Sequence, residues 1–208
     1  MKTQKNTKSI EDRILSCVHR KGEGWVFSPV SFLPFGSPEA IRKSLSRLEE
    51  KGIIRRLAWG LYDYPRQHKV LGTLPPSIDA IAKAIAKRDK INLQPSGALA
   101  ANLIGLSDQV PAKIVYLSDG NAKKITVGKT ELIFKNATPK IMASAGTPTG
   151  LLIQSLRYLG KDHLTDNVAA RLKIYLKKWK RTEFVRFYSL APAWMSKYIH
   201  QLVGVPNG

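Results

Sequence analysis

Two groups of cationic side chains in this sequence have the residue types and the spacing needed to hold phosphate groups. The first lies within residues 42–56, where arginine and lysine recur at helical spacing and then in a short hairpin. The second lies within residues 173–181 and is interleaved with Tyr175 and Trp179. Arginine can bind a guanine edge through two hydrogen bonds, and lysine and arginine side chains neutralise phosphates. Both groups therefore indicate binding chemistry.

The whole chain is strongly basic. Its 208 residues include 34 Lys and Arg against 15 Asp and Glu, which gives a formal net charge of +19 at pH 7. The excess is present in residues 1–70, 71–160 and 161–208 alike, so it is not a basic tail on a neutral body. Such a balance usually indicates a polyanionic partner, most often nucleic acid and less often an anionic membrane surface. The alternative is a basic surface that serves solubility alone.

The composition is that of an ordinary globular protein. Hydrophobic residues make up 43% and charged residues 24%, which excludes a disordered or fibrous chain, and the length fits one large domain or two small ones. No apolar run reaches the ~18 residues of a membrane helix, and the basic N-terminus is not followed by the apolar core of a secretory signal. The single cysteine, Cys17, permits no internal disulfide and suits a reducing compartment. We expect a cytoplasmic protein with no membrane partner.

Residues 1–70 have the order of elements of a winged helix-turn-helix domain. The strongest signal is Ser37 as the N-cap of a helix with Pro38 at its first position. The expected elements are a helix over residues 10–20, a strand over 25–27, a brief helix over 28–33, a helix over 38–51, and strands over 53–57 and 61–64. This order of helix, strand, two helices and a two-stranded wing defines the first predicted domain, residues 1–70.

The helix over residues 38–51 is the expected recognition helix. Ile41, Leu45 and Leu48 form its apolar stripe, and at about 100° per residue the opposite face is cationic. The predicted DNA-binding residues are Ser37, Arg42, Lys43, Ser46 and Arg47 on this helix, with Arg55, Arg56 and Trp59 in the wing. The helix arginines would read base edges, and the wing arginines would contact phosphates. Glu49 and Glu50 would repel phosphate, and the alternative is that these residues form solvated faces of a small α+β domain.

A second domain, mixed α+β, is expected over residues 71–208, after the turn-rich stretch that ends in Pro75 and Pro76. Helices are expected over residues 77–88 and 98–104, strands over 113–117, 124–127 and 131–135, and a helical tail from Thr149 onward. The three strands predict an antiparallel meander. The predicted fold class is therefore α+β, with an N-terminal winged helix-turn-helix domain and a C-terminal domain that combines a small antiparallel sheet with a helical tail.

Other motifs do not support catalytic or metal chemistry. Gly128-Lys129-Thr130 resembles the end of a phosphate-binding loop, but Lys123 stands where the upstream glycine belongs, so a hairpin turn is the better interpretation. The four histidines and Cys17 have no metal-ligand spacing, and the carboxylates lie at predicted helix ends and turns. We expect no catalytic residue, no metal and no cofactor.

The basic tail helix has two interpretations. A second basic surface would comprise Lys173, Lys177, Lys178, Lys180 and Arg181, and would bind nucleic acid by neutralising phosphates. The same pattern also fits an amphipathic helix that buries its aromatic residues and solvates its lysines. Two alternatives to DNA binding follow: an RNA-binding protein whose C-terminal helices are the main surface, and a C-terminal domain with an undetected enzyme activity.

Two stretches of the chain resemble the AbiEi antitoxins of bacterial type IV toxin–antitoxin systems, which act in abortive infection, a form of phage defence. One is GSPEAIRKSLSRLEEKGIIRR, residues 36–56, continuing to Gly60-Leu61-Tyr62. The other, more specific, is PSGALAANLIGLS, residues 95–107, with Gln109-Val110-Pro111-Ala112. Together the two stretches extend the resemblance over residues 10–160.

The resemblance implies a transcriptional repressor with an N-terminal winged helix that binds inverted repeats at its own promoter. It also implies a C-terminal domain that counters a nucleotidyltransferase-like toxin, AbiEii, without a stable complex. The recognition positions that it implies are Arg42, Lys43, Ser46 and Arg47, with Arg55 and Arg56 at the wing. It implies no catalytic residues.

Overall fold

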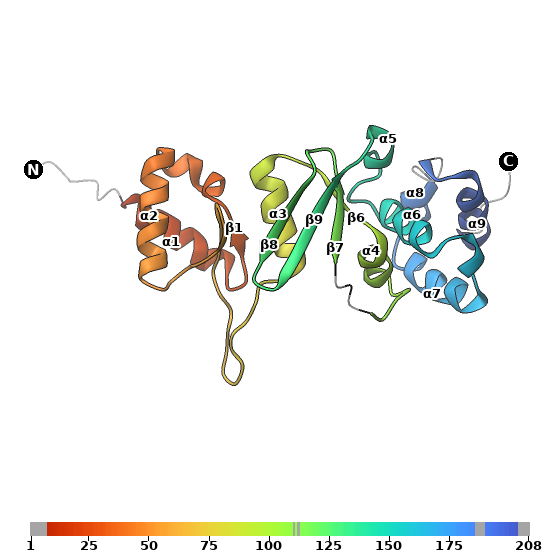
Figure 1. Ribbon diagram of the computed structural model, residues 1–208, viewed down its shortest axis with the longest axis horizontal. Coiled ribbons are helices and arrows are strands. Elements are labelled where there is room, and N and C mark those ends of the chain that lie inside the picture. Colours follow the sequence, from red (N-terminus) through yellow and green to blue (C-terminus); the bar gives the residue numbers. More distant parts are fainter. Residues whose placement is uncertain (1–7, 110, 112, 186–189, 204–208) are drawn as a thin grey trace, which may run out of the picture. The chain divides into compact units, whose positions relative to one another are not determined.

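A computed structural model describes residues 8–109, 111, 113–185 and 190–203, and the chain divides into two compact units, Met1–Lys90 and Ile91–Gly208 (Figure 1). Both units combine helices with a small sheet, so the protein has a mixed α+β fold. The division falls after the helix over residues 78–89, whereas the sequence places the boundary at residue 70.

The first unit contains a three-helix core and a three-stranded sheet. Its elements are α1 (Ile10–Lys21), β1 (Val26–Phe27), the 3-10 helix η1 (Pro29–Phe35), α2 (Pro38–Glu50), β2 (Arg55–Ala58), β3 (Leu61–Asp63), β4 (Gln67–His68), β5 (Gly72–Thr73) and α3 (Ile78–Asp89). The sheet has the order β1-β3-β2 and is antiparallel throughout. This is the expected order of elements over residues 10–64.

Local caps and one apolar core explain the positions of α1 and α2. The Ser9 hydroxyl accepts a hydrogen bond from the Asp12 amide, and the Ser37 hydroxyl accepts one from the Ala40 amide, so each serine satisfies an orphan donor at a helix start. The helices bury their apolar stripes in one cluster with β1, η1 and β3, built from Ile14, Val18, Phe27, Phe32, Ile41, Leu45, Leu48, Ile54 and Tyr62.

Residues 65–90 belong to the first unit because they are bonded to its sheet. Arg55 of β2 donates a hydrogen bond to the Leu74 carbonyl at 3.1 Å, and Arg88 of α3 donates one to the Trp59 carbonyl at 3.0 Å. Helix α3 also packs against β1. The segment expected to be a linker thus folds back onto the sheet.

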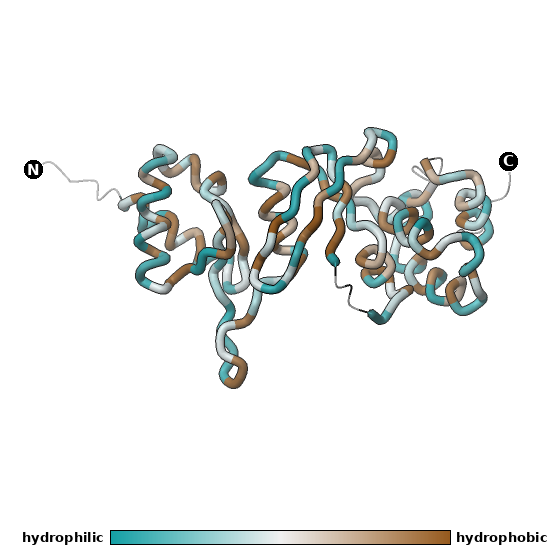
Figure 2. Tube along the Cα trace, in the orientation of Figure 1, coloured by the Kyte–Doolittle hydropathy of each residue, from teal (hydrophilic) through white to brown (hydrophobic). Residues whose placement is uncertain are grey.

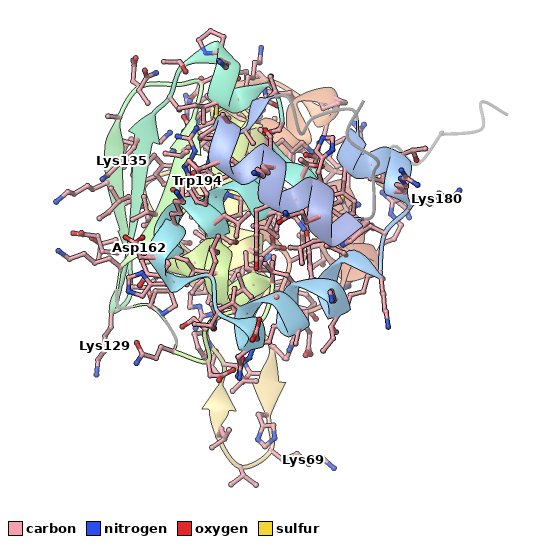
Figure 3. All side chains as sticks on the ribbon, turned by 90° about the vertical axis from the view of Figure 1, so that its right-hand side faces the viewer. Lys69, Lys129, Lys135, Asp162, Lys180 and Trp194 are labelled. Atoms are coloured by element: carbon pink, nitrogen blue, oxygen red, sulfur yellow. The ribbon has the colours of Figure 1, made fainter. Side chains whose placement is uncertain are left out.

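Within this segment, β4 and β5 form a hairpin that projects from the unit (Figure 1). Its tip carries two apolar residues, Val70 and Leu71 (Figure 2). Both are exposed to solvent, at 85% and 70%. The His68 Nδ1 atom accepts hydrogen bonds from the Val70 and Leu71 amides, and Lys69 lies beside them at the tip (Figure 3).

The second unit consists of a four-stranded sheet and a group of helices. Its elements are β6 (Leu93–Pro95), α4 (Gly97–Leu103), β7 (Ile114–Ser118), β8 (Lys123–Val127), β9 (Thr130–Asn136), α5 (Pro139–Met142), α6 (Pro148–Leu159), the 3-10 helix η2 (Lys161–His163), α7 (Asp166–Leu176), α8 (Arg181–Val185) and α9 (Ala193–Val203). Helices α6, α7, α8 and α9 share one apolar cluster, to which Leu152, Leu156, Leu172, Phe184 and Met195 contribute.

The expected antiparallel meander is wrong. The sheet has the order β6-β7-β9-β8, and β7 pairs with β9 in parallel, while β6 with β7 and β8 with β9 are antiparallel. The two inner strands bury Ile114 and Tyr116 on β7 and Leu132 and Phe134 on β9. Strand β8 lies at the edge of the sheet, and of its five residues only Val127 is buried.

Candidate nucleic-acid interface

Helix α2 presents a cationic face to solvent because its opposite face is fully buried. Ile41 and Leu45 are 0% exposed and Leu48 is 1% exposed. The predicted residues Arg42, Lys43, Ser46 and Arg47 are all exposed, as the apolar stripe requires. Ser37 caps the start of the same helix. The structure therefore brings five of the eight predicted DNA-binding residues together on one element.

Glu39 and Glu50 of the same helix bind two of the side chains on this face. Lys43 forms an ion pair with Glu39 at 2.9 Å, and the Ser46 hydroxyl donates to Glu50 at 3.2 Å. Because the side chains of Lys43 and Glu39 are 69% and 70% exposed, the pair contributes at most about 1 kcal/mol, and a phosphate can replace the carboxylate. The i, i+4 spacing of Glu39 and Lys43 in the sequence would have indicated the pair.

Arg42 and Arg47 differ in their surroundings. Arg47 lies 3.8 Å from Glu11 of α1, a carboxylate that also pairs with Lys51. Arg42 forms no ion pair with any of the residues that the structure describes. Arg42 is therefore the cation of α2 that a ligand can engage without displacing a carboxylate.

The β2–β3 turn carries an exposed aromatic residue beside a cation. Trp59 is 85% exposed, and the Arg56 guanidinium lies 5.2 Å from the centre of its ring. The Arg88 hydrogen bond to the Trp59 carbonyl holds this turn against α3. Both side chains are accessible at the position predicted for a wing.

Arg55 is not a free cation at the wing, because it is paired within the sheet. It donates two hydrogen bonds to Asp63, at 3.0 and 2.6 Å, and a third to the Leu74 carbonyl. Asp63 is 1% exposed, so its carboxylate requires this partner. The hydrogen bonds that Arg55 donates to Asp63 raise the pKa of Arg55 above its ordinary value. Arg55 stabilises the sheet.

In the second unit, the predicted basic surface divides into two sets. Lys173, Lys177, Lys178, Lys180 and Arg181 are all exposed. Lys173, Lys177 and Arg181 line a pocket of about 360 Å³ together with Leu176, Trp179, Phe184 and Leu202. Lys178 and Lys180 lie outside this lining, and Figure 3 labels Lys180 on the segment between α7 and α8.

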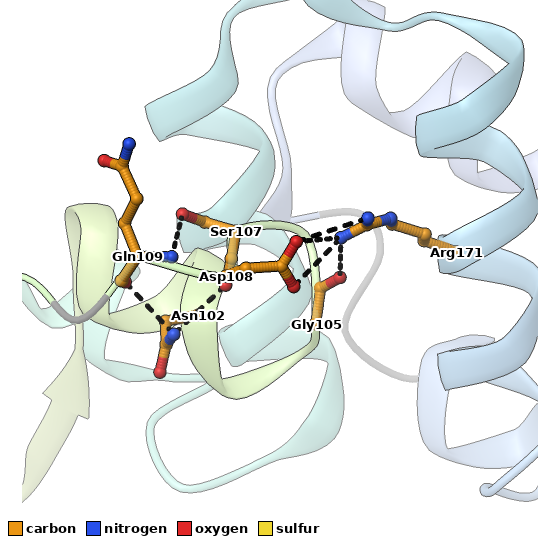
Figure 4. Close-up of polar contacts among 6 residues, drawn as sticks. All are labelled: Asn102, Gly105, Ser107, Asp108, Gln109 and Arg171. Atoms are coloured by element: carbon orange, nitrogen blue, oxygen red, sulfur yellow. Dashed lines mark hydrogen bonds and ion pairs between the residues drawn. The ribbon is translucent and has the colours of Figure 1, made fainter.

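The other cation at the middle of α7 has a structural role. Arg171 donates to the Gly105 carbonyl at 3.1 Å and forms an ion pair with Asp108 at 3.4 Å (Figure 4). The same loop is closed by Asn102, which donates to the Ser107 and Gln109 carbonyls (Figure 4). These contacts fasten α7 to the loop after α4.

Of the two aromatic residues in this basic segment, Tyr175 of α7 is buried and Trp179, which follows α7, is not. Tyr175 is buried, its hydroxyl donates to the Pro148 carbonyl at 3.2 Å, and burial raises its pKa to about 12. Trp179 remains 46% exposed and contacts the Tyr175 ring. The amphipathic interpretation thus holds for Tyr175 and not for Trp179.

Gly128-Lys129-Thr130 forms the turn between β8 and β9, as expected for a hairpin. Among the described residues, no group of three or more His, Cys, Asp or Glu side chains could hold a metal ion. None of the described helices has the length and apolar character needed to cross a membrane.

Comparison with known proteins places the chain in a family. A family model described as "Family of unknown function (DUF6088)" matches residues 13–184. The chain belongs to this family. No curated protein matches it. Among solved structures it is similar to the RV2827C protein from Mycobacterium tuberculosis, with 14% sequence identity, a TM-score of 0.46, and coverage of 95% of this chain and 78% of that one.

Proposed function

We propose that this member of the DUF6088 family binds duplex DNA through a winged helix-turn-helix formed by α1 to β3. The observation that carries the proposal is the solvent-facing side of α2, where Arg42, Lys43, Ser46 and Arg47 lie opposite a stripe that is 0–1% exposed. A helix of this kind fits the major groove, and its arginines can bind guanine O6 and N7. The net charge of +19 supplies the long-range attraction.

The environments of these side chains indicate which of them would contact bases and which would contact phosphates. Arg42, without a carboxylate partner among the described residues, and Arg47, held loosely by Glu11, would read base edges. Lys43 would exchange Glu39 for a phosphate, which leaves the Glu39 carboxylate able to accept a hydrogen bond from a cytosine amino group. Arg56 and Trp59 at the wing would contact the DNA backbone.

The biological role that we propose is that of an autoregulating antitoxin of a type IV toxin–antitoxin system. The support is the resemblance of residues 36–62 and 95–112 to the AbiEi antitoxins. On this proposal, the first unit represses its own promoter and the second counters a nucleotidyltransferase-like toxin. A reporter fused to the upstream DNA, together with co-expression of the neighbouring gene, tests both parts: repression and rescue of growth are expected.

The DNA-binding proposal is tested by fluorescence anisotropy with a duplex from the upstream region and a scrambled duplex. Arg42→Ala and Arg47→Ala should each cost about 1–3 kcal/mol on the upstream duplex and reduce its preference over the scrambled one. Arg56→Ala should weaken both duplexes alike and lower the salt dependence.

Lys83→Ala is the matched control, because Lys83 is an exposed cation of α3 in the same unit, paired with Asp79. It removes the same charge away from α2 and should leave binding nearly unchanged. Equal, sequence-independent losses from Lys83→Ala and Arg42→Ala would overturn the assignment of α2 as the recognition helix.

A further inference from the structure

The pocket at the end of α7 combines three cations with an apolar floor. Lys173 and Lys177 are four residues apart and therefore lie on one side of the helix, and Arg181 begins α8. Leu176 and Phe184, which are 9% and 2% exposed, form its apolar floor, and Trp179, which is 46% exposed, also lines it. None of the described lining residues is acidic. The volume of about 360 Å³ lies near the lower end of the range for sites that hold one small molecule.

The walls of this pocket are fixed by buried hydrogen bonds to the start of α6. The Thr149 hydroxyl, on a residue that is 0% exposed, donates to the Glu183 carbonyl of α8 at 2.7 Å. The Tyr175 hydroxyl donates to the Pro148 carbonyl at 3.2 Å and so anchors the end of α7. Tyr175 in turn contacts Trp179, with the ring centres 6.3 Å apart. The cations and the indole are thus attached to elements held by the core.

An anionic group in the pocket would be neutralised by Lys173, Lys177 and Arg181. A flat apolar group would pack against Trp179 and the apolar floor. A ligand with both parts joined is a nucleotide, since its base has a π-face and its phosphate is anionic. We propose that this pocket binds an unpaired nucleotide of a single strand, with the base against Trp179 and the phosphate between the cations. The proposal does not depend on DNA binding by α2.

The test compares variants of the full chain for binding to a labelled single strand of about ten nucleotides, which is within the site sizes of single-strand binders. The pair Lys173→Ala with Lys177→Ala and the single change Trp179→Ala should each weaken binding about tenfold or more. The pair Lys178→Ala with Lys180→Ala is the matched control, since it removes the same charge from the same segment outside the pocket. It should lose no more than about threefold.

Two further binding measurements separate base stacking on Trp179 from electrostatic attraction to the phosphates. An abasic strand with the same phosphates should bind the unaltered chain more weakly and should be insensitive to Trp179→Ala. Adenosine monophosphate as competitor shows whether a free nucleotide suffices or whether a strand is required. Trp179→Leu, which keeps apolar volume without a base-sized ring, separates loss of stacking from loss of folding, and thermal unfolding by circular dichroism monitors the latter.

The outcomes are decisive in both directions. Selective loss of single-strand binding in the pocket variants, with duplex binding retained, supports the site. Equal losses in the pocket pair and the control pair, equal binding of abasic and normal strands, or an equal loss of duplex binding would overturn it.

Discussion

Neighbouring arginines in β2 have different roles because successive side chains leave a strand on opposite faces. Arg55 faces Asp63 across the sheet and binds it, whereas Arg56 is exposed beside Trp59. A register continued without interruption from the Ala58–Leu61 pair would place Arg56 opposite Asp63. The register shift between Arg56 and Ala58 instead brings Arg55 there. The sequence therefore predicted the hairpin and its two cations but not which cation remains free.

The two arginines should separate stability from binding. Arg55→Ala leaves the Asp63 carboxylate without its partner, and because the Arg55 side chain is 35% exposed, water limits the cost to about 1–3 kcal/mol. Urea unfolding followed by circular dichroism measures this loss. Arg56→Ala should change stability by less than about 0.5 kcal/mol.

Arg55→Lys is informative as a third variant, since it keeps the charge and loses the two-pronged geometry, so a partial loss of stability is expected. A fully stable Arg55→Ala protein that binds DNA weakly would restore the phosphate-contact role that the sequence suggested.

At the scale of elements, helix starts were predictable and strand partners were not. Ser37 caps α2 as predicted, and Ser9 and Ser77 cap α1 and α3 in the same way. The strands expected over residues 113–117 and 131–135 are present as β7 and β9. Alternation along a strand, however, states only which side chains share a face. The pairing of β7 with β9 depends on which strands bury the most apolar side-chain surface. That burial follows from packing against helices distant in sequence. The pocket likewise combines α7, α8 and α9, so sequence alone revealed its cations and not its floor.

Helix α6 contains a glycine whose lack of a side chain is required by packing. A Cβ atom at Gly150 would overlap the Ser144 carbonyl oxygen and lie 2.8 Å from the Gln94 side-chain oxygen. Gly150→Ala should gain helix propensity of about 1 kcal/mol but lose more to overpacking, which typically costs about 1–3 kcal/mol. We expect a net lowering of the melting temperature, measured by circular dichroism.

Arg157→Ala is the control for that change, because Arg157 is exposed on the same helix and should alter stability by less than about 0.5 kcal/mol. A Gly150→Ala protein as stable as this control would show that Ser144 moves aside at no cost.

At the scale of the whole molecule, charge is distributed over two units with separate cores. The core of the first unit is covered by α1, α2 and the sheet, and the second unit has its own cluster around α6. Exposed cationic side chains occur in both units, on α2 and around the pocket. The sequence predicted this distribution of charge, whereas the two compact units divide after Lys90 and not at residue 70.

Where the first unit ends can be tested with fragments. Helix α3 buries Ile81, Ala82 and Ile85 and is bonded to the β2–β3 turn through Arg88. Burying each isoleucine contributes about 1.5–3 kcal/mol, a large share of the stability of a small domain. Residues 1–90 should therefore unfold cooperatively and show dispersed amide resonances by NMR, while residues 1–70 should be unfolded or far less stable. Within the longer fragment, Ile85→Ala should cost about 2–5 kcal/mol and Lys83→Ala almost nothing. If residues 1–70 alone matched the longer fragment in melting temperature, α3 would contribute nothing to the first unit and the earlier boundary would be correct.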